Sequence, residues 1–220
     1  YGTGAFFLMQ TKEKCLENQS GLLTTVAWQI KGELSYALEG SCFITGAAVS
    51  FLRDNFEIID HVNKTELKNK VEASPHLYFV PSLCGLGAPW WRAEVKGAFL
   101  GLTRSTSKEQ MIQACLEGIC FQVEDLISVF RKEASLDLKK LSVDGAACAN
   151  NLLMKTQAHL SNLTLVKPEI LETTAYGAAL MAAHGCELVS LGHLKTLKNK
   201  ATFFKPTEQN EKQRHDHSFS

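Results

Sequence analysis

Hydrophobic residues in the first forty positions occur in short runs that are typical of β-strands. Residues 5–9, 22–30 and 34–38 are rich in β-branched, aromatic and aliphatic side chains, and turns containing Gly, Ser, Asn or Lys separate them. These runs predict the strands of a meander. Two later apolar runs, at residues 77–81 and 97–102, predict further strands on either side of a loop rich in Gly, Pro and Trp at residues 84–96.

Apolar residues at three- and four-residue steps predict helices over residues 44–52 and 107–134, and Ser74-Pro75 ends a further short helix predicted over residues 65–73. The helix over 65–73 is charged and expected to be exposed. The longest one begins with Ser107 and Gln110 in the spacing of a capping box, in which each residue's side chain bonds the backbone of the other. One face of that helix is expected to be buried.

The second half of the chain alternates between strand and helix patterns. Strands are predicted at residues 140–143 and 163–166, and helices at 151–160 and 174–183, which indicates an α/β layer with parallel pairing. Together the two halves predict one three-layer α/β domain over residues 1–206. The polar composition from Phe204 onward predicts a disordered tail at residues 207–220, in which His215 and His217 are expected to be solvated.

Composition narrows the class of protein. The chain has 220 residues, 45% of them apolar, with 23 basic residues against 23 acidic ones. Such a chain buries enough surface to fold without disulfides, and its balanced charge provides no footprint for nucleic acid or an anionic membrane. No apolar stretch approaches the ~20 residues of a membrane-spanning segment. Partners are therefore expected to be small molecules or proteins.

The cysteines predict a reducing compartment, here the cytoplasm. Seven are present, an odd number, and they are scattered along the chain without a C-x-x-C motif. Most have apolar neighbours, which favours a structural role over a reactive one.

Three short segments contain small residues where a ligand could approach the backbone. Gly2-Thr3-Gly4 is either a phosphate loop or a plain hairpin turn, and residues 143–151 form either an anion site or an ordinary strand-to-helix loop with an Asn N-cap. The predicted helix that contains Gly46 has a face of small side chains there, which could accept a flat ring or another helix. No catalytic triad or carboxylate pair is evident. Glu124 and Asp125 are interpreted as helix-surface residues, so the residues alone indicate no general base.

Taken together, several stretches resemble the C-terminal half of the FGGY family of carbohydrate kinases. They are YGTGAF at 1–6, GLLTTVAW at 21–28, YALEGSCFITGAAVSFLRDN at 36–55, VPSLCGLGAPWW at 80–91, GAFLGLT at 97–103, residues 143–151 and ETTAYGAALM at 172–181. The resemblance extends to about residue 206. The stretches YALEG…GAAVSFLRDN and GLGAPWW are similar to the glycerol kinases of this family rather than to its pentulose kinases.

The resemblance implies an actin-like (ribonuclease H-like) ATPase domain, with a mixed sheet flanked by helices. It also implies an enzyme that transfers the γ-phosphoryl group of Mg-ATP to glycerol, giving glycerol 3-phosphate, with ATP/ADP and Mg²⁺ as cofactors. Five positions correspond to nucleotide contacts in the family: Thr3, Gly46, Ser50, Ala146 and Asn150. Phe6 corresponds to the aromatic residue that packs against the glycerol carbons.

Two of these positions depart from the family pattern. Ser50 is shorter than the Gln or Arg of many relatives, and Ala146 replaces a glycine. A Cβ atom at 146 would cost about 1 kcal/mol if that position required a positive φ, and it would also crowd a ligand. The sequence therefore predicts weakened nucleotide affinity.

The resemblance places the catalytic Asp, the Mg-binding Asp and most glycerol contacts in an N-terminal half that this chain lacks. No catalytic residue is therefore assigned, and the chain alone is expected to be inactive. Two alternatives stay open: a truncated, non-catalytic nucleotide-binding or interaction module, and a kinase for another polyol or sugar. Exposed apolar residues that would face the absent half, among them Phe6, Trp90 and Trp91, predict self-association, including a possible homo-oligomer.

Overall fold

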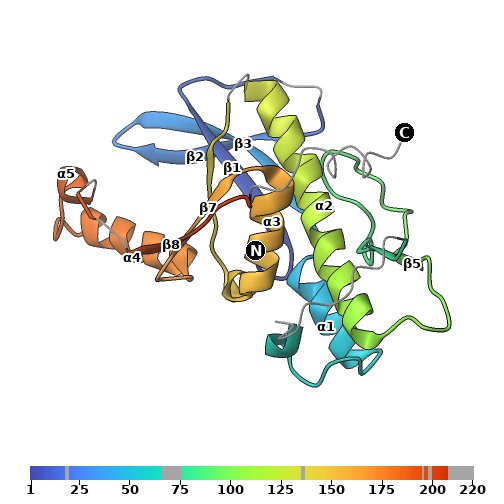
Figure 1. Cartoon of the computed structure of the whole chain (residues 1–220). Coiled ribbons are helices and arrows are strands. Elements are labelled where there is room, and N and C mark those ends of the chain that lie inside the picture. The colour runs from blue at the N-terminus through green and yellow to red at the C-terminus, as the bar shows by residue number, and fades with distance from the viewer. Residues whose placement is uncertain (18–19, 66–75, 135–136, 195, 198–199, 208–220) are drawn as a thin grey trace.

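A computed structural model describes residues 1–17, 20–65, 76–134, 137–194, 196–197 and 200–207 of the chain. Its hydrogen-bonded strands form three sheets, with the long helix α2 (Lys108–Ala134) running through the middle of the molecule (Figure 1). Within these residues, no helix combines the length and the apolar character needed to cross a membrane.

The N-terminal sheet contains β1 (Ala5–Lys12), β2 (Leu23–Ile30) and β3 (Glu33–Cys42), all antiparallel. The predicted strands are present, but their order is β1-β3-β2, so the prediction of a simple meander was wrong. The reason lies in burial. Most of the C-terminal part of β3 is buried, whereas no residue of β2 is, and the most buried strand takes the centre.

After this sheet the chain forms α1 (Gly46–Asp54) and the short 3-10 helix η1 (Val62–Thr65). Helix α1 begins two residues later than predicted. Thr65 was expected to open an exposed helix, but it is the last residue of η1 and is buried. Residues 66–73, the rest of that predicted helix, lie outside the described residues.

The short strands β4 (Tyr78–Val80) and β5 (Ala98–Leu100) pair antiparallel around the predicted loop. Helix α2 follows, and its capping box is confirmed: the Ser107 N–H donates to Gln110 Oε1 at 3.0 Å, and the Gln110 N–H donates to Ser107 Oγ at 3.2 Å. The sequence thus predicted both the beginning and the end of the longest helix.

The C-terminal part alternates as predicted. Its elements are β6 (Lys140–Ser142), η2 (Ala146–Ala149), α3 (Asn151–Ser161), β7 (Thr164–Pro168), α4 (Thr173–Gly185), α5 (Leu191–Leu194) and β8 (Ala201–Phe204). Strand β7 pairs parallel with β6 and antiparallel with β8, which makes this sheet mixed.

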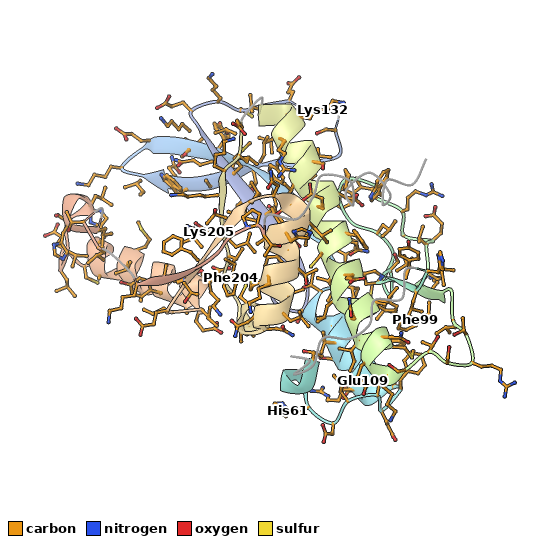
Figure 2. The ribbon with its side chains drawn as sticks, viewed as in Figure 1. His61, Phe99, Glu109, Lys132, Phe204 and Lys205 are labelled. Atoms are coloured by element: carbon orange, nitrogen blue, oxygen red, sulfur yellow. The ribbon has the colours of Figure 1, made fainter. Side chains whose placement is uncertain are left out.

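Strand β8 was not predicted, and the polar tail does not begin at Phe204. That residue pairs with Leu165 of β7, is 7% exposed and lies beside α3 (Figure 2). The polar residues that follow it obscured a four-residue strand. His215 and His217 lie outside the described residues.

The core lies where α2 and α3 pack against each other and against the sheets. Helix α2 buries a continuous stripe: Leu116, Ile119, Cys120, Val123, Leu126 and Ile127. Helix α3 contributes Leu153, Met154 and Ala158. Helices α4 and α5 project away from this core (Figure 1), and α4 has no buried residue.

Candidate functional site

A cavity of about 640 Å³ lies among the start of the chain, α1, η1, α2 and the beginning of α3. Its deeper wall is apolar, made by Val49, Leu116, Ile119 and Leu153, each at most 9% exposed. Small residues and a few hydroxyl and amide groups line the rest. The volume falls within the ~300–1,000 Å³ typical of small-molecule sites.

All five residues predicted to contact nucleotide line this cavity: Thr3, Gly46, Ser50, Ala146 and Asn150. They come from three separate segments of the chain: the start at Thr3, helix α1 and the loop that leads into α3. Phe6 does not join them. Its side chain, on β1, is 66% exposed and is absent from the lining. The structure thus assembles the predicted nucleotide residues and separates them from the predicted glycerol residue.

The first turn of α1 holds Gly2 and Thr3 in place. The backbone N–H groups of Thr45 and Gly46 donate to Thr3 O and Gly2 O, both at 2.9 Å, and the Ala47 N–H donates to Thr3 O at 3.1 Å. A Cβ atom at Gly46 would lie 2.6 Å from Gly2 O, so only glycine allows this approach. The backbone of Gly2 and Thr3 is therefore held against the first turn of α1, while the Thr3 side chain stays exposed at the cavity.

The turn between β6 and α3 is held by Gly145. Its φ is 88°, and an added Cβ would lie 2.5 Å from Tyr1 O. Ala146, by contrast, is the first residue of η2 and is not among the residues of positive φ. The condition for strain at Ala146, a positive φ, is therefore not met, because the positive φ falls on the glycine before it. The predicted crowding of a ligand by its Cβ is not affected by this finding.

Asn150 is the N-cap of α3, since its Oδ1 accepts a hydrogen bond from the Leu153 N–H at 3.0 Å. The predicted N-cap is therefore confirmed, while the anion site at this loop stays a prediction; Asn150 also lines the cavity. Its Nδ2 donates to Thr65 Oγ1 at 2.7 Å, which links α3 to η1.

The lining residues include no Asp, Glu, His, Lys or Arg. Within the described part of the chain, the wall thus offers neither a carboxylate for a metal ion nor a side chain able to accept a proton from a hydroxyl group. Among the described residues, no group of three or more His, Cys, Asp or Glu side chains is placed to hold a metal.

Residues 1–186 match the C-terminal domain of the FGGY family of carbohydrate kinases. The chain belongs to this family. The FGGY chain is 48% identical over 183 residues to glycerol kinase 2 of Thermotoga maritima, and 42% identical over 219 residues to the glycerol kinase of Staphylococcus epidermidis. These matches cover 83% and 98% of this chain but only 37% and 43% of the relatives. The FGGY chain therefore spans less than half the length of these two kinases.

Solved structures of FGGY kinases confirm the predicted fold class. The structure of Plasmodium falciparum glycerol kinase with ADP superimposes with a TM-score of 0.85 at 30% identity, covering 98% of this chain and 44% of that one. A ligand-bound xylulose kinase from Lactobacillus acidophilus gives a TM-score of 0.76 at 20% identity, covering 98% and 43%, and shows the common fold alone. The FGGY chain thus has the actin-like α/β fold expected from its motifs.

Burial confirms a structural role for four cysteines of this FGGY chain: Cys42, Cys115, Cys120 and Cys148. Burial raises the pKa of Cys115 to about 12, so its thiol stays neutral at physiological pH. The Cys148 thiol donates to Asp144 O at 2.9 Å beneath the cavity turn.

Sequence reasoning missed the contribution of η1. Val62 and Thr65 both line the cavity, yet a four-residue 3-10 turn leaves no helical periodicity to detect. The interpretation of Glu124 as a surface residue was also wrong. It is half-buried and pairs with Arg131 at 2.7 Å, and burial raises the pKa of its carboxyl despite that partner. The Glu–Arg spacing of seven residues on α2 was the available signal.

Proposed function

We propose that this chain is the nucleotide-binding part of an ATP-dependent glycerol kinase, which transfers the γ-phosphoryl group of ATP to glycerol. The observation that carries the proposal is the single cavity in which Thr3, Gly46, Ser50, Ala146 and Asn150 meet. The glycerol kinase relatives, and the neighbour whose structure includes ADP, support the same ligand.

The cavity wall suits the two chemically different parts of a nucleotide. Its apolar side, with Val49, Ile119 and Leu153, would accept a flat base by excluding water from both surfaces. The wall also offers the hydroxyl groups of Thr3 and Ser50, which are donors for ribose or phosphate oxygens.

Magnesium would arrive with the phosphates, because the described lining residues supply no carboxylate of their own. When bound, the ion would offset phosphate charge during transfer. We also propose that glycerol, the group that accepts its proton and the remaining metal ligands belong to a part of the enzyme outside this chain. Phe6, exposed beyond the cavity, would contact the glycerol carbons from this side.

Nucleotide titration of the 220-residue chain tests the proposal. ADP and ATP should bind saturably and, at a hundredfold excess over Kd, stabilise the folded chain by roughly 2.7 kcal/mol. Calorimetry and thermal unfolding measure both quantities. Glycerol should not stimulate ADP release from this chain, and stimulation would contradict the assignment of the catalytic groups to another part of the enzyme.

A matched pair of variants locates the binding site. Ala149→Phe fills the cavity from η2 and should abolish ADP binding, whereas Ala182→Phe adds the same side chain to the exposed helix α4 and should leave binding unchanged. Equal affinity in both variants would place the nucleotide elsewhere. A chain that binds no nucleotide at all would favour the alternative of an interaction module.

The proposal of glycerol, and not another polyol, as the substrate rests on sequence identity to the relatives. The two glycerol kinase relatives share 42–48% identity with this chain, against 20% for the xylulose kinase neighbour. A panel of polyols and sugars, assayed by ADP release with the enzyme that carries this chain, should show glycerol as the preferred acceptor. Preference for a pentulose would overturn the substrate assignment.

We further propose that this chain functions in the cytoplasm and self-associates when isolated. Seven unpaired cysteines support the location, since free thiols persist where the environment is reducing. Phe6, Trp90 and Trp91, 66%, 57% and 44% exposed, support the association. Sedimentation velocity should show a rising mass with concentration, whereas a monomer throughout would count against it.

A further inference from the structure

The Thr65–Asn150 hydrogen bond joins two walls of the cavity that are 85 residues apart in the sequence. Thr65 ends η1, and Asn150 caps α3. Both residues line the cavity, and Thr65 is only 2% exposed. The bond therefore lies at the point where η1 and α3 meet at the proposed nucleotide site.

The direction of each hydrogen bond is fixed by chemistry. The Thr65 hydroxyl has one hydrogen, which it donates to Val62 O at 2.7 Å, so towards Asn150 it acts as an acceptor. An amide NH₂ group only donates, and the Asn150 Nδ2 provides the matching hydrogen. A relay thus runs from Asn150 through Thr65 to Val62.

The same bonds fix the orientation of the Asn150 amide. Its Oδ1 is held by the Leu153 N–H at 3.0 Å and its Nδ2 by Thr65 at 2.7 Å, so the oxygen and nitrogen cannot exchange places. The amide group has the capacity for one further donated and one further accepted hydrogen bond. That capacity points in a set direction before any ligand arrives, which lowers the ordering cost of binding.

We propose that Thr65 is a positioning residue for the nucleotide. It orients the Asn150 amide and holds η1 against α3 as one wall of the cavity, without itself contacting the ligand. This inference rests on the proposed nucleotide site. It assigns a role to a residue outside every recognisable motif of the sequence.

Removing the hydroxyl group tests this role. Thr65→Val keeps the shape of the side chain and should weaken ADP binding roughly threefold to tenfold, the value expected for one lost hydrogen bond. Thr65→Ser restores the hydroxyl and should bind within about twofold of wild type. Thr11→Val is a matched control, because its hydroxyl also donates to a carbonyl three residues away, Lys14 O at 2.7 Å, but at an exposed site outside the cavity lining.

A thermodynamic cycle separates positioning from simple stabilisation. Asn150→Asp keeps the N-cap oxygen but loses the donor to Thr65. If the pair acts as a unit, the Thr65→Val/Asn150→Asp double variant should bind ADP no more weakly than the weaker single variant. Additive losses would show independent roles and overturn the inference. So would wild-type affinity in Thr65→Val, even if that variant were less stable to urea.

The outcomes distinguish this inference from the function on which it rests. No ADP binding by the wild-type chain would overturn both. Binding by wild type that is unchanged in Thr65→Val would overturn the positioning role alone. If Thr65→Val failed to fold, faster amide hydrogen exchange at residues 62–65 in the ligand-free Asn150→Asp variant would support the link, and unchanged exchange would contradict it.

Discussion

Helices α3 and α4 lie close together in the sequence yet differ completely in what they bury. Eight of the 13 residues of α4 are Ala, Leu, Met or Tyr, against five Ala, Leu or Met residues among the 11 of α3. Nevertheless α3 buries five residues and α4 none. The less apolar helix forms the core and one wall of the cavity, while the more apolar one lies exposed.

The arrangement of apolar residues accounts for this difference. In α3 the buried residues, three apolar and two polar, fall on one face that packs with α2, and exposed residues such as Lys155 lie on the other. In α4 the apolar residues occupy every position from 178 to 183 and surround the helix, so no inner face is defined. The apolar content of a helix indicates that it should be buried, but only the periodicity of its apolar residues indicates which face packs against the rest of the protein.

The largest expected effect compares one substitution in both helices. Met154→Ala in α3, where the side chain is fully buried, should reduce the free energy of unfolding by about 2–5 kcal/mol because it leaves a cavity. Met181→Ala in α4, 42% exposed, should change it by less than about 0.5 kcal/mol. Urea unfolding of both variants measures the contrast. Equal losses would show that α4 is covered in solution.

Replacing glycine by alanine should change the free energy of unfolding in opposite directions in the turn before α3 and in α4. Gly145→Ala, at φ 88° and against Tyr1 O, should destabilise the chain by roughly 1–3 kcal/mol. Gly177→Ala in α4, where nothing lies within 4 Å of the new Cβ, should stabilise it by about 0.5–1 kcal/mol through helix propensity. Thermal unfolding gives both signs, and a stabilising Gly145→Ala would contradict the described turn.

A smaller effect is expected on nucleotide affinity. Ala146→Gly removes a Cβ atom from the cavity wall and should tighten ATP binding by about 1 kcal/mol, or roughly fivefold, if that atom crowds the ligand. Ala182→Gly in α4 controls for the general cost of a helical glycine and should leave affinity unchanged. Calorimetric titration measures the ATP affinity of both variants, and an unchanged affinity in Ala146→Gly would show that the Cβ atom of Ala146 does not crowd the ligand.

The smallest effect concerns pH and the buried side of α2. Burial raises the pKa of the Glu124 carboxyl above its unfolded value of about 4.3, so the native state favours the protonated form. Its contribution to stability is therefore fully present below pH ~4.3 and is lost as pH rises through the native pKa. Glu124→Gln should flatten the dependence of Tm on pH in that range. An unaltered slope would assign the effect to another group.

Periodicity and local caps were sufficient to predict most elements from the sequence. The capping box at Ser107 and the alternation after residue 140 are local patterns, and the structure reproduces both. Strand order was not predictable in this way, because β1 pairs with β3 and not with β2, the strand that follows it in the sequence. Strand β8 was missed because four residues beside a polar stretch carry too little pattern.

The candidate site was predictable only where motifs occur. Thr3, Gly46 and Asn150 stand in recognisable segments, so resemblance identified them and the fold brought them together. Thr65 has no motif, and its relation to Asn150 arises from tertiary structure alone. Whether Ala146 needs a positive φ could not be decided from the sequence, and the structure shows that the positive φ belongs to Gly145.

The backbone of Tyr1 has a consequence for the order of folding. Its nitrogen donates to Asp144 O at 2.9 Å, and its carbonyl accepts from the Ala147 N–H at 3.0 Å, so the cavity closes only when positions more than 140 residues apart meet. Contacts of such long separation form late, since the loop entropy must be overcome first. The helices can assemble earlier, and the appearance of nucleotide binding during refolding should therefore mark its final step.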